Sequence, residues 1–196
     1  GPHVAAGRPD VRPGAAQGRS ACDAAAEGAP PTGLVGAGTG TTVGKWAGRE
    51  HAVPGGFGFG VAEEGETRAA AVAVVNAVGD VLAPDGTVLA GTRAPEARRT
   101  PPPEETSPLP ANTVLAAVAV EGTFEKREVR WLASRGSDGI TIAVHPAHTR
   151  YDGDVVFAVA APAPPGSAPA NLDVLGPLVT AAVAAAVRNA VAHDDA

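Results

Sequence analysis

The fold is decided by the stretch Pro110-Ala111-Asn112-Thr113-Val114-Leu115-Ala116-Ala117-Val118-Ala119-Val120. A proline-rich, charged segment leads up to it, and the apolar run that follows is typical of a buried strand. If the bond before Thr113 is cut, this residue carries both a nucleophilic hydroxyl and a basic α-amino group at the start of a rigid strand. The alternative is that Thr113 simply opens a β-strand, as threonine often does.

The composition indicates one folded domain. A chain of 196 residues can bury one sizeable core. Its 25 glycines and 19 prolines lie mostly between runs of alanine and valine, so the chain is not of low complexity. Only 18% of the residues are charged, the net charge is −6, and the densest basic cluster, residues 126–130, contains an acid. We therefore expect no nucleic-acid partner.

The single cysteine, Cys22, cannot form an internal disulfide, and this favours a reducing compartment. Its alanine neighbours predict a small, buried thiol. No uninterrupted apolar run reaches the length that spans a bilayer, and the first residues show no signal-peptide pattern. We expect a cytoplasmic protein without a membrane partner.

Apolar runs and turn signals alternate along the chain, which predicts a mixture of helices and strands. Thr123 and Asn171 are the expected N-caps of the two later helices. The loop 91–112 is long for a compact domain, and such loops are usually functional or disordered. The predicted helices span residues 14–27, 124–144 and 171–193, and the predicted strands span residues 57–62, 67–75, 88–89, 113–120 and 155–160.

A glycine run ends at Lys45. It fails the Walker phosphate motif, because Thr39 stands where glycine is required and Trp46 where a hydroxyl residue is required. It also fails the dinucleotide fingerprint, so we expect no cofactor. The run fits better as backbone packed tightly around an internal site. Lys45 is then either a buried cation paired with a carboxylate or a surface lysine at a turn.

Three further side chains are candidates for chemistry. Asn76 ends an apolar strand and must find hydrogen bonds there. Asp152 and Asp154 flank one glycine before another strand; buried together, they would have different pKa values, and the alternative is a solvated turn or a weak cation site. His145 and His148 suggest a metal, but two ligands around a proline favour the end of a helix, and we predict no metal site.

Four blocks of sequence together resemble one family. They are Val35–Lys45, Val74–Asp80, Asn112-Thr113 and His148–Ala158. The chain is similar, from about Arg8 to its C-terminus, to the DmpA-type L-aminopeptidase/D-esterase family. That family also contains β-peptidyl aminopeptidases and nylon-oligomer hydrolases. The blocks occur in the family's order.

The resemblance implies an α/β fold, the αββα sandwich of self-processing N-terminal-nucleophile hydrolases, here lacking part of its N-terminal portion. It implies cleavage between Asn112 and Thr113. Residues 1–112 would be the C-terminal part of the α-chain region and residues 113–196 the β chain, together one domain. Family α chains begin well upstream of residue 1, so the alternative is a truncated, uncleaved and inactive homologue that serves as a binding or assembly module.

The resemblance also implies roles for the candidate residues. Thr113 would be the nucleophile, Asp152 and Asp154 the acidic pair, and Lys45 and Asn76 the remaining polar positions of the site. A threonine nucleophile with an Asp-Gly-Asp block favours the pattern of the nylon hydrolases without fixing a nylon substrate. The expected partners are a small peptide, amide or ester substrate and further copies of the processed chain in a homo-oligomer.

Overall fold

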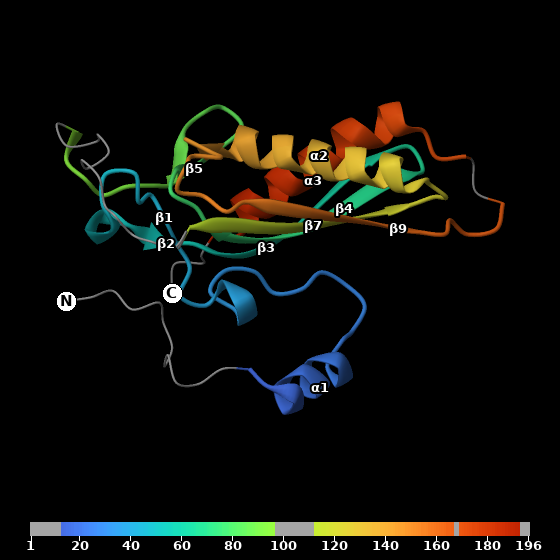
Figure 1. The fold of residues 1–196 in the computed structure, drawn as a ribbon, viewed down its shortest axis with the longest axis horizontal. Helices are drawn as coiled ribbons and strands as arrows, with labels where there is room; N and C mark the ends of the chain where they lie inside the picture. The colour runs from blue at the N-terminus through green and yellow to red at the C-terminus, as the bar shows by residue number, and fades with distance from the viewer. Residues whose placement is uncertain (1–12, 97–111, 167–168, 193–196) are drawn as a thin grey trace.

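The computed structural model describes residues 13–96, 112–166 and 169–192. Its centre is a four-stranded sheet with two long helices side by side on one face (Figure 1). The strands, in spatial order, are β3 (Gly56–Glu64), β4 (Thr67–Asn76), β7 (Thr113–Glu121) and β9 (Val155–Ala161), and the helices are α2 (Lys126–Ala143) and α3 (Leu172–Asn189). The β3–β4 and β4–β7 pairs are antiparallel, whereas β7 and β9 are parallel.

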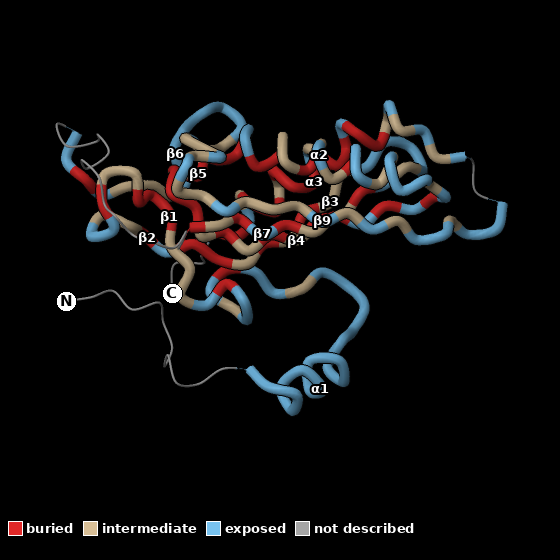
Figure 2. The backbone as a smooth tube through the Cα atoms, viewed as in Figure 1, coloured by how far each residue is buried: buried red, intermediate tan, exposed pale blue. Residues whose placement is uncertain are grey.

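Smaller elements surround one end of this sheet. A three-stranded sheet has the order β6 (Val88–Ala90), β5 (Asp80–Leu82), β8 (Val144–His145), and β1 (Thr42–Val43) pairs with β2 (Val53–Pro54). Two short 3₁₀ turns, η1 (Gly36–Gly38) and η2 (Arg49–His51), flank β1. Helix α1 (Ala15–Asp23) lies apart from the sheet and buries no residue (Figure 2).

The two faces of the sheet differ in burial because side chains alternate along a strand. In β7 the side chains of Val114, Ala116, Val118 and Val120 are buried under the helices. The neighbouring Leu115 is 46% exposed, and Phe157 on β9 is 61% exposed. Among the described residues the four-stranded sheet therefore carries one helical layer, and its other, partly apolar face is left uncovered.

Glycines bring β3 close to helix α3. Gly56, Gly58 and Gly60 alternate along the strand and point toward the helix. A Cβ atom at Gly58 would lie 1.9 Å from the carbonyl oxygen of Ala186, so no side chain fits there. This close approach explains the alternation of glycine with aromatic residues between positions 56 and 60.

Helix α3 belongs to the core. By length and composition it could cross a membrane, but it packs against β3, β4 and α2, and half of it is buried. Its N-cap is Asn171, whose side chain accepts a hydrogen bond from the backbone N–H of Asp173, as expected. Pro177 lies inside the helix, beyond its first turn, and has no N–H to donate to the carbonyl of Asp173 one turn earlier.

Two local predictions are wrong. The N-cap of helix α2 is Glu125 and not Thr123, and the Glu125 N–H donates a 2.7 Å hydrogen bond to the side chain of Glu128. Cys22 is exposed rather than buried, since α1 packs against no core. Of the predicted loop 91–112, residues 97–111 lie outside the described residues. The predicted strands of the central sheet agree with the structure to within two residues at each end.

The glycine contact predicts a specific loss of stability. Replacing Gly58 by alanine should lower the free energy of unfolding by about 1–3 kcal/mol, because the new methyl group must push α3 away from β3. Urea unfolding monitored by circular dichroism measures the change. Gly18→Ala is the matched control, since a Cβ there meets nothing within 4 Å. Equal midpoints for the two variants would contradict the proposed contact.

Candidate active site

Thr113 opens β7 at the edge of the core. The antiparallel register places it directly opposite Asn76, the last residue of β4. Asn112, just before it, forms an isolated parallel bridge with Asp152. The end of one strand, the start of another and the loop before β9 thus meet at a single point, as the four sequence blocks predict.

The carbonyl group of Asn112 is held from two sides. The Thr113 hydroxyl donates a hydrogen bond of 2.6 Å to the carbonyl oxygen, and the backbone N–H of Gly153 donates a second one of 2.9 Å. The Asn112 side chain is buried, and its Nδ2 lies 3.4 Å from the carbonyl oxygen of Tyr151. The carbonyl oxygen of Asn112 therefore accepts two hydrogen bonds, one from the Thr113 hydroxyl and one from a backbone amide.

Lys45 is buried and not a surface lysine at a turn, but its hydrogen-bond partner is the Asn76 amide where the sequence alternative expected a carboxylate. Its Nζ donates to the side-chain oxygen of Asn76 at 2.8 Å and to the backbone oxygen of the same residue at 3.1 Å. The backbone N–H of Thr42 also donates to the Asn76 side-chain oxygen, at 3.1 Å. The side-chain oxygen of Asn76 accepts from two donors, and this fixes the orientation of the amide. The side-chain nitrogen is the atom of this amide that donates.

The glycine run permits this burial. Gly44, next to Lys45, has a φ of +72°, and a Cβ there would lie 2.4 Å from the backbone nitrogen of Thr92. The backbone of the two residues is held by hydrogen bonds to the carbonyl oxygens of Gly79 and Val78. Only glycine allows the chain to turn this tightly around the lysine.

Burial lowers the pKa of the Lys45 ammonium from 10.5 to about 7. Loss of hydration is the largest cause, the positive charge of Arg49 adds to it, and the negative charge of Asp152 opposes both. A large fraction of the Lys45 side chains is therefore neutral at physiological pH.

Asp152 anchors the loop that precedes β9. Its Oδ2 accepts hydrogen bonds from the hydroxyl of Thr149 at 2.7 Å and from the N–H of the same residue at 3.0 Å. Its Oδ1 accepts a longer bond, 3.3 Å, from the N–H of Val78. The carboxylate thus joins the loop to the segment between β4 and β5.

Asp154 holds the backbone beside Thr113. Its Oδ1 accepts a 2.7 Å hydrogen bond from the N–H of Val114, and its Oδ2 lies 2.8 Å from Nδ1 of His148. Burial raises the pKa of the Asp154 carboxyl, and the charge of Asp152 adds to this. The hydrogen bond from Val114 and the contact with His148 act in the opposite direction.

All the predicted site residues are brought together by direct contacts or strand pairing. Sequence reasoning missed the N–H of Gly153, which carries no side-chain signal, and Ser137, which contacts His148 from α2. His145 lies in β8, paired with Asp80, and does not join His148. In the described parts of the chain no three metal-binding side chains gather.

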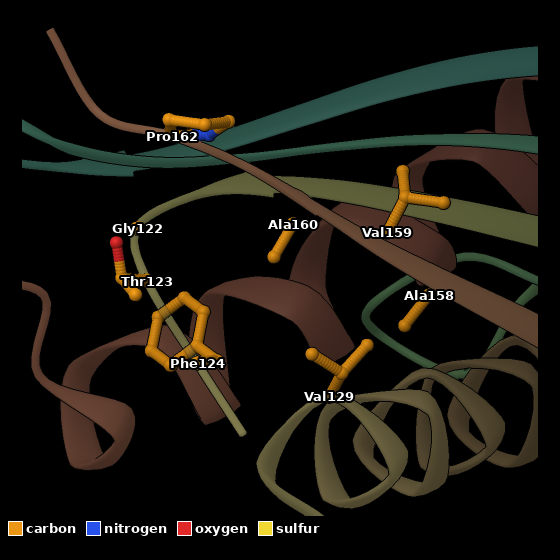
Figure 3. A pocket seen from close by; sticks show the side chains of 8 residues that line it. All are labelled: Gly122, Thr123, Phe124, Val129, Ala158, Val159, Ala160 and Pro162. Carbon is orange, nitrogen blue, oxygen red and sulfur yellow. The ribbon is translucent and has the colours of Figure 1, made fainter. Parts of the chain in front are cut away.

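An apolar hollow lies at the opposite end of the sheet (Figure 3). Strand β7 begins at Thr113 and ends just before Gly122, so the hollow is roughly 26 Å from the nucleophile at 3.3 Å per residue. Its lining holds no titratable side chain, and the hydroxyl of Thr123 is its one polar side-chain group. The lining residues are Gly122, Thr123, Phe124, Val129, Ala158, Val159, Ala160 and Pro162.

Comparison with known proteins places this geometry in a family. The model of peptidase family S58 matches residues 9–195. An uncharacterized aminopeptidase of Mycobacterium tuberculosis is 36% identical over 197 residues, which cover 90% of this chain and 55% of that protein. A 6-aminohexanoate-oligomer endohydrolase of Agromyces is 31% identical over 84% of this chain and 50% of its own length. The chain spans about half the length of these relatives.

Solved structures confirm the expected fold. The L-aminopeptidase D-Ala-esterase/amidase of Ochrobactrum anthropi, described as a variant of the Ntn-hydrolase fold, superposes with a TM-score of 0.61 and 24% identity. It is matched over 89% of this chain and 48% of its own. A β-aminopeptidase of Burkholderia gives a TM-score of 0.60 at 23% identity, over 89% of this chain and 50% of its own. The described sheet and helices therefore belong to an Ntn-type αββα sandwich.

The lowered pKa of Lys45 predicts a pH-dependent stability. Between pH 7 and 10.5 the unfolded chain binds more protons at this residue than the folded chain, so the free energy of unfolding should rise with pH. The contribution is at most about 1.4 kcal/mol per pH unit. Urea unfolding at several pH values measures the slope. Lys45→Met, which keeps the bulk without the amine, should lack this contribution, and equal slopes would contradict the assignment.

Proposed function

Because this chain belongs to peptidase family S58, we propose that Thr113 is the nucleophile of an N-terminal-nucleophile hydrolase that cuts its own chain between Asn112 and Thr113. One observation carries the proposal. The Thr113 hydroxyl lies 2.6 Å from the carbonyl oxygen of Asn112, and the N–H of Gly153 donates to the same oxygen. A nucleophile and an amide donor thus converge on one peptide group.

Self-cleavage would proceed by acyl transfer. The Thr113 oxygen attacks the carbonyl carbon of Asn112 and loses its proton, while the carbonyl oxygen becomes an oxyanion. The N–H of Gly153 donates to that oxyanion. The C–N bond then breaks, the nitrogen of Thr113 takes up a proton and becomes an amine, and Asn112 is left as an ester on the hydroxyl. Water hydrolyses the ester and releases the new N-terminus.

Turnover would use the group that cleavage creates. A free α-amino group has an ordinary pKa of about 7.7–8.0, so a neutral fraction can take the proton from the Thr113 hydroxyl near neutral pH. The oxygen attacks the carbonyl of the substrate, the leaving amine or alcohol departs with a proton, and water resolves the acyl-enzyme. The Asn76 side chain donates to the oxyanion through its nitrogen, while its oxygen accepts from Lys45 and Thr42 and so orients the amide.

The remaining polar residues would position these groups. Lys45 orients the Asn76 amide and, with a pKa of about 7, does so without a permanent positive charge next to the amine. Asp154 fixes the N–H of Val114 and thereby the direction in which Thr113 leaves the strand. Asp152 joins the neighbouring loop to the same end of the sheet.

The substrates we propose are small molecules with an amide, peptide or ester bond. The names of the relatives support this class, since one is an aminopeptidase and another acts on 6-aminohexanoate oligomers. Hydrolysis of an amide bond is common to both names. Purified protein should accordingly be screened with peptide amides, 6-aminohexanoate oligomers and esters.

Intact mass under denaturing conditions tests the self-cleavage. We expect two fragments of the wild-type chain with their boundary between Asn112 and Thr113. Thr113→Ala should give a single uncut species, because the attacking oxygen is gone, and Thr113→Ser should still be cut. Thr87→Ala is the control, since that threonine only bonds Asp85 in an exposed turn. Cleavage of Thr113→Ala at the same bond would refute the proposal, and an uncut wild type would favour a binding or assembly module.

A second experiment tests the oxyanion donor. Asn76→Ala should lower kcat by about 10²–10³-fold with a smaller change in KM, because the donation matters most in the transition state. Initial rates on the best substrate of the screen provide the measurement. Asn189→Ala is a suitable control, since the Asn189 amide bonds the Phe59 carbonyl oxygen on β3. An unchanged kcat for Asn76→Ala would show that another group stabilises the oxyanion.

A further inference from the structure

A chain of three side chains leads from helix α2 to the nucleophile. The Ser137 hydroxyl lies 3.0 Å from Nε2 of His148, whose Nδ1 lies 2.8 Å from Asp154. The other oxygen of Asp154 accepts the N–H of Val114, the residue after Thr113. His148 is thus two hydrogen bonds away from the backbone of the strand that carries the nucleophile.

The cluster has the residue types of a serine-hydrolase triad, but its surroundings do not suit that chemistry. Ser137 lies inside α2, where backbone N–H groups donate along the helix. Among the described residues its hydroxyl therefore has no pair of amide donors beside it to stabilise an oxyanion. The cluster is better suited to holding Asp154 than to a second nucleophilic site.

The backbone of His148 is specialised for this contact. Its φ is +52°, the left-handed region that histidine, asparagine and aspartate adopt more readily than most residues. This conformation follows Pro146-Ala147 and places the ring between α2 and the loop before β9. The ring is 37% exposed, whereas the side chain of Asp154 is only 5% exposed.

Both ring nitrogens have partners, which fixes the ring. With Asp154 ionised, Nδ1 carries the proton and donates to Oδ2. Nε2 then faces the hydroxyl of Ser137 at 3.0 Å and the carbonyl oxygen of the same residue at 3.4 Å. A neutral ring accepts from the hydroxyl and a protonated ring donates to these oxygens, so the Nδ1 contact with Asp154 persists in both states.

Resting on the function proposed above, we propose that His148 is a positioning residue that keeps Asp154 ionised and aimed at the N–H of Val114. Ser137, on α2, fixes the orientation of the imidazole ring through its contact with Nε2. The groups that act on Asp154 are His148 and the N–H of Val114, which favour its charged form, and Asp152, which opposes it. Without the imidazole, burial and Asp152 act against Val114 alone, and Asp154 takes up a proton at higher pH. Its protonated oxygen is a poorer acceptor for Val114, so Thr113 loses its fixed direction.

Carboxyl ¹³C NMR of Asp154 during a pH titration tests the proposal directly. His148→Gly removes the ring and tolerates the positive φ, so the pKa of Asp154 should rise above its wild-type value. His148→Asn and His148→Asp form a matched pair of equal shape. In His148→Asn the side-chain amide can still donate, so the pKa of Asp154 should stay close to its wild-type value. In His148→Asp no donor remains, so the pKa of Asp154 should rise further. A pKa of Asp154 that is the same in all four proteins would overturn the proposal.

The pH–rate profile gives the second readout. In wild type the first acid limb of kcat reports the α-amino base, and protonation of Asp154 adds a second, steeper fall at lower pH. This second limb should move to higher pH in His148→Gly, with about a tenfold loss below its midpoint for each pKa unit and little change in KM. Ser137→Ala should move it less, because the contact with Asp154 remains. A role in folding alone would lower the amount of active protein without moving the limb. Failure of wild-type self-cleavage would refute the proposed function, while the NMR titration would still decide the role of His148.

Discussion

The antiparallel register between β4 and β7 is the constraint on which the candidate site depends. It places Asn76 opposite Thr113, and it cannot slip by one residue without turning the buried valines and alanines of β7 to the open face of the sheet. Burial of that apolar face therefore fixes where the nucleophile lies. The same register brings Lys45 to the site, because its ammonium is bound to Asn76. A chemical arrangement is thus specified by the packing of a core.

Lys45 and Asp154, two of the polar residues around Thr113, share a second property: burial disfavours the charged form of each side chain. Burial lowers the pKa of Lys45 and raises that of Asp154, so both groups are displaced toward neutrality. Each keeps its hydrogen bonds to the backbone or to an amide and so orients neighbouring groups, and Lys45, with a pKa of about 7, does this without a permanent positive charge. Such an environment suits a reaction whose base is an amine, because a permanent cation nearby would hold that amine's pKa low and weaken it as a base.

Much of the fold could be predicted because its signals are local. The run after Asn112 and the cap at Asn171 each specify an element from adjacent residues, and the structure confirms those elements. The four blocks of the site were also visible in the sequence. The contacts of Ser137 and Gly153 were not, since one depends on where α2 packs and the other on a backbone N–H. Cys22 was misjudged because alanine neighbours indicate a helix but do not show which surface, if any, it covers.

The glycines of β3 restrict which substitutions the contact between β3 and α3 can tolerate during evolution. A larger residue in a core is often accommodated by a smaller residue that faces it. Gly56, Gly58 and Gly60 cannot be replaced by anything smaller, because glycine has no side chain. The atoms of α3 nearest to Gly56, Gly58 and Gly60 are the backbone carbonyl oxygens of Ala190, Ala186 and Ala182, so no smaller side chain on the helix can make room for a methyl group on the strand. These glycines should therefore vary less among homologues than buried residues elsewhere in the sheet. Slow drift at such positions would reflect a lack of room and not a part in the chemistry.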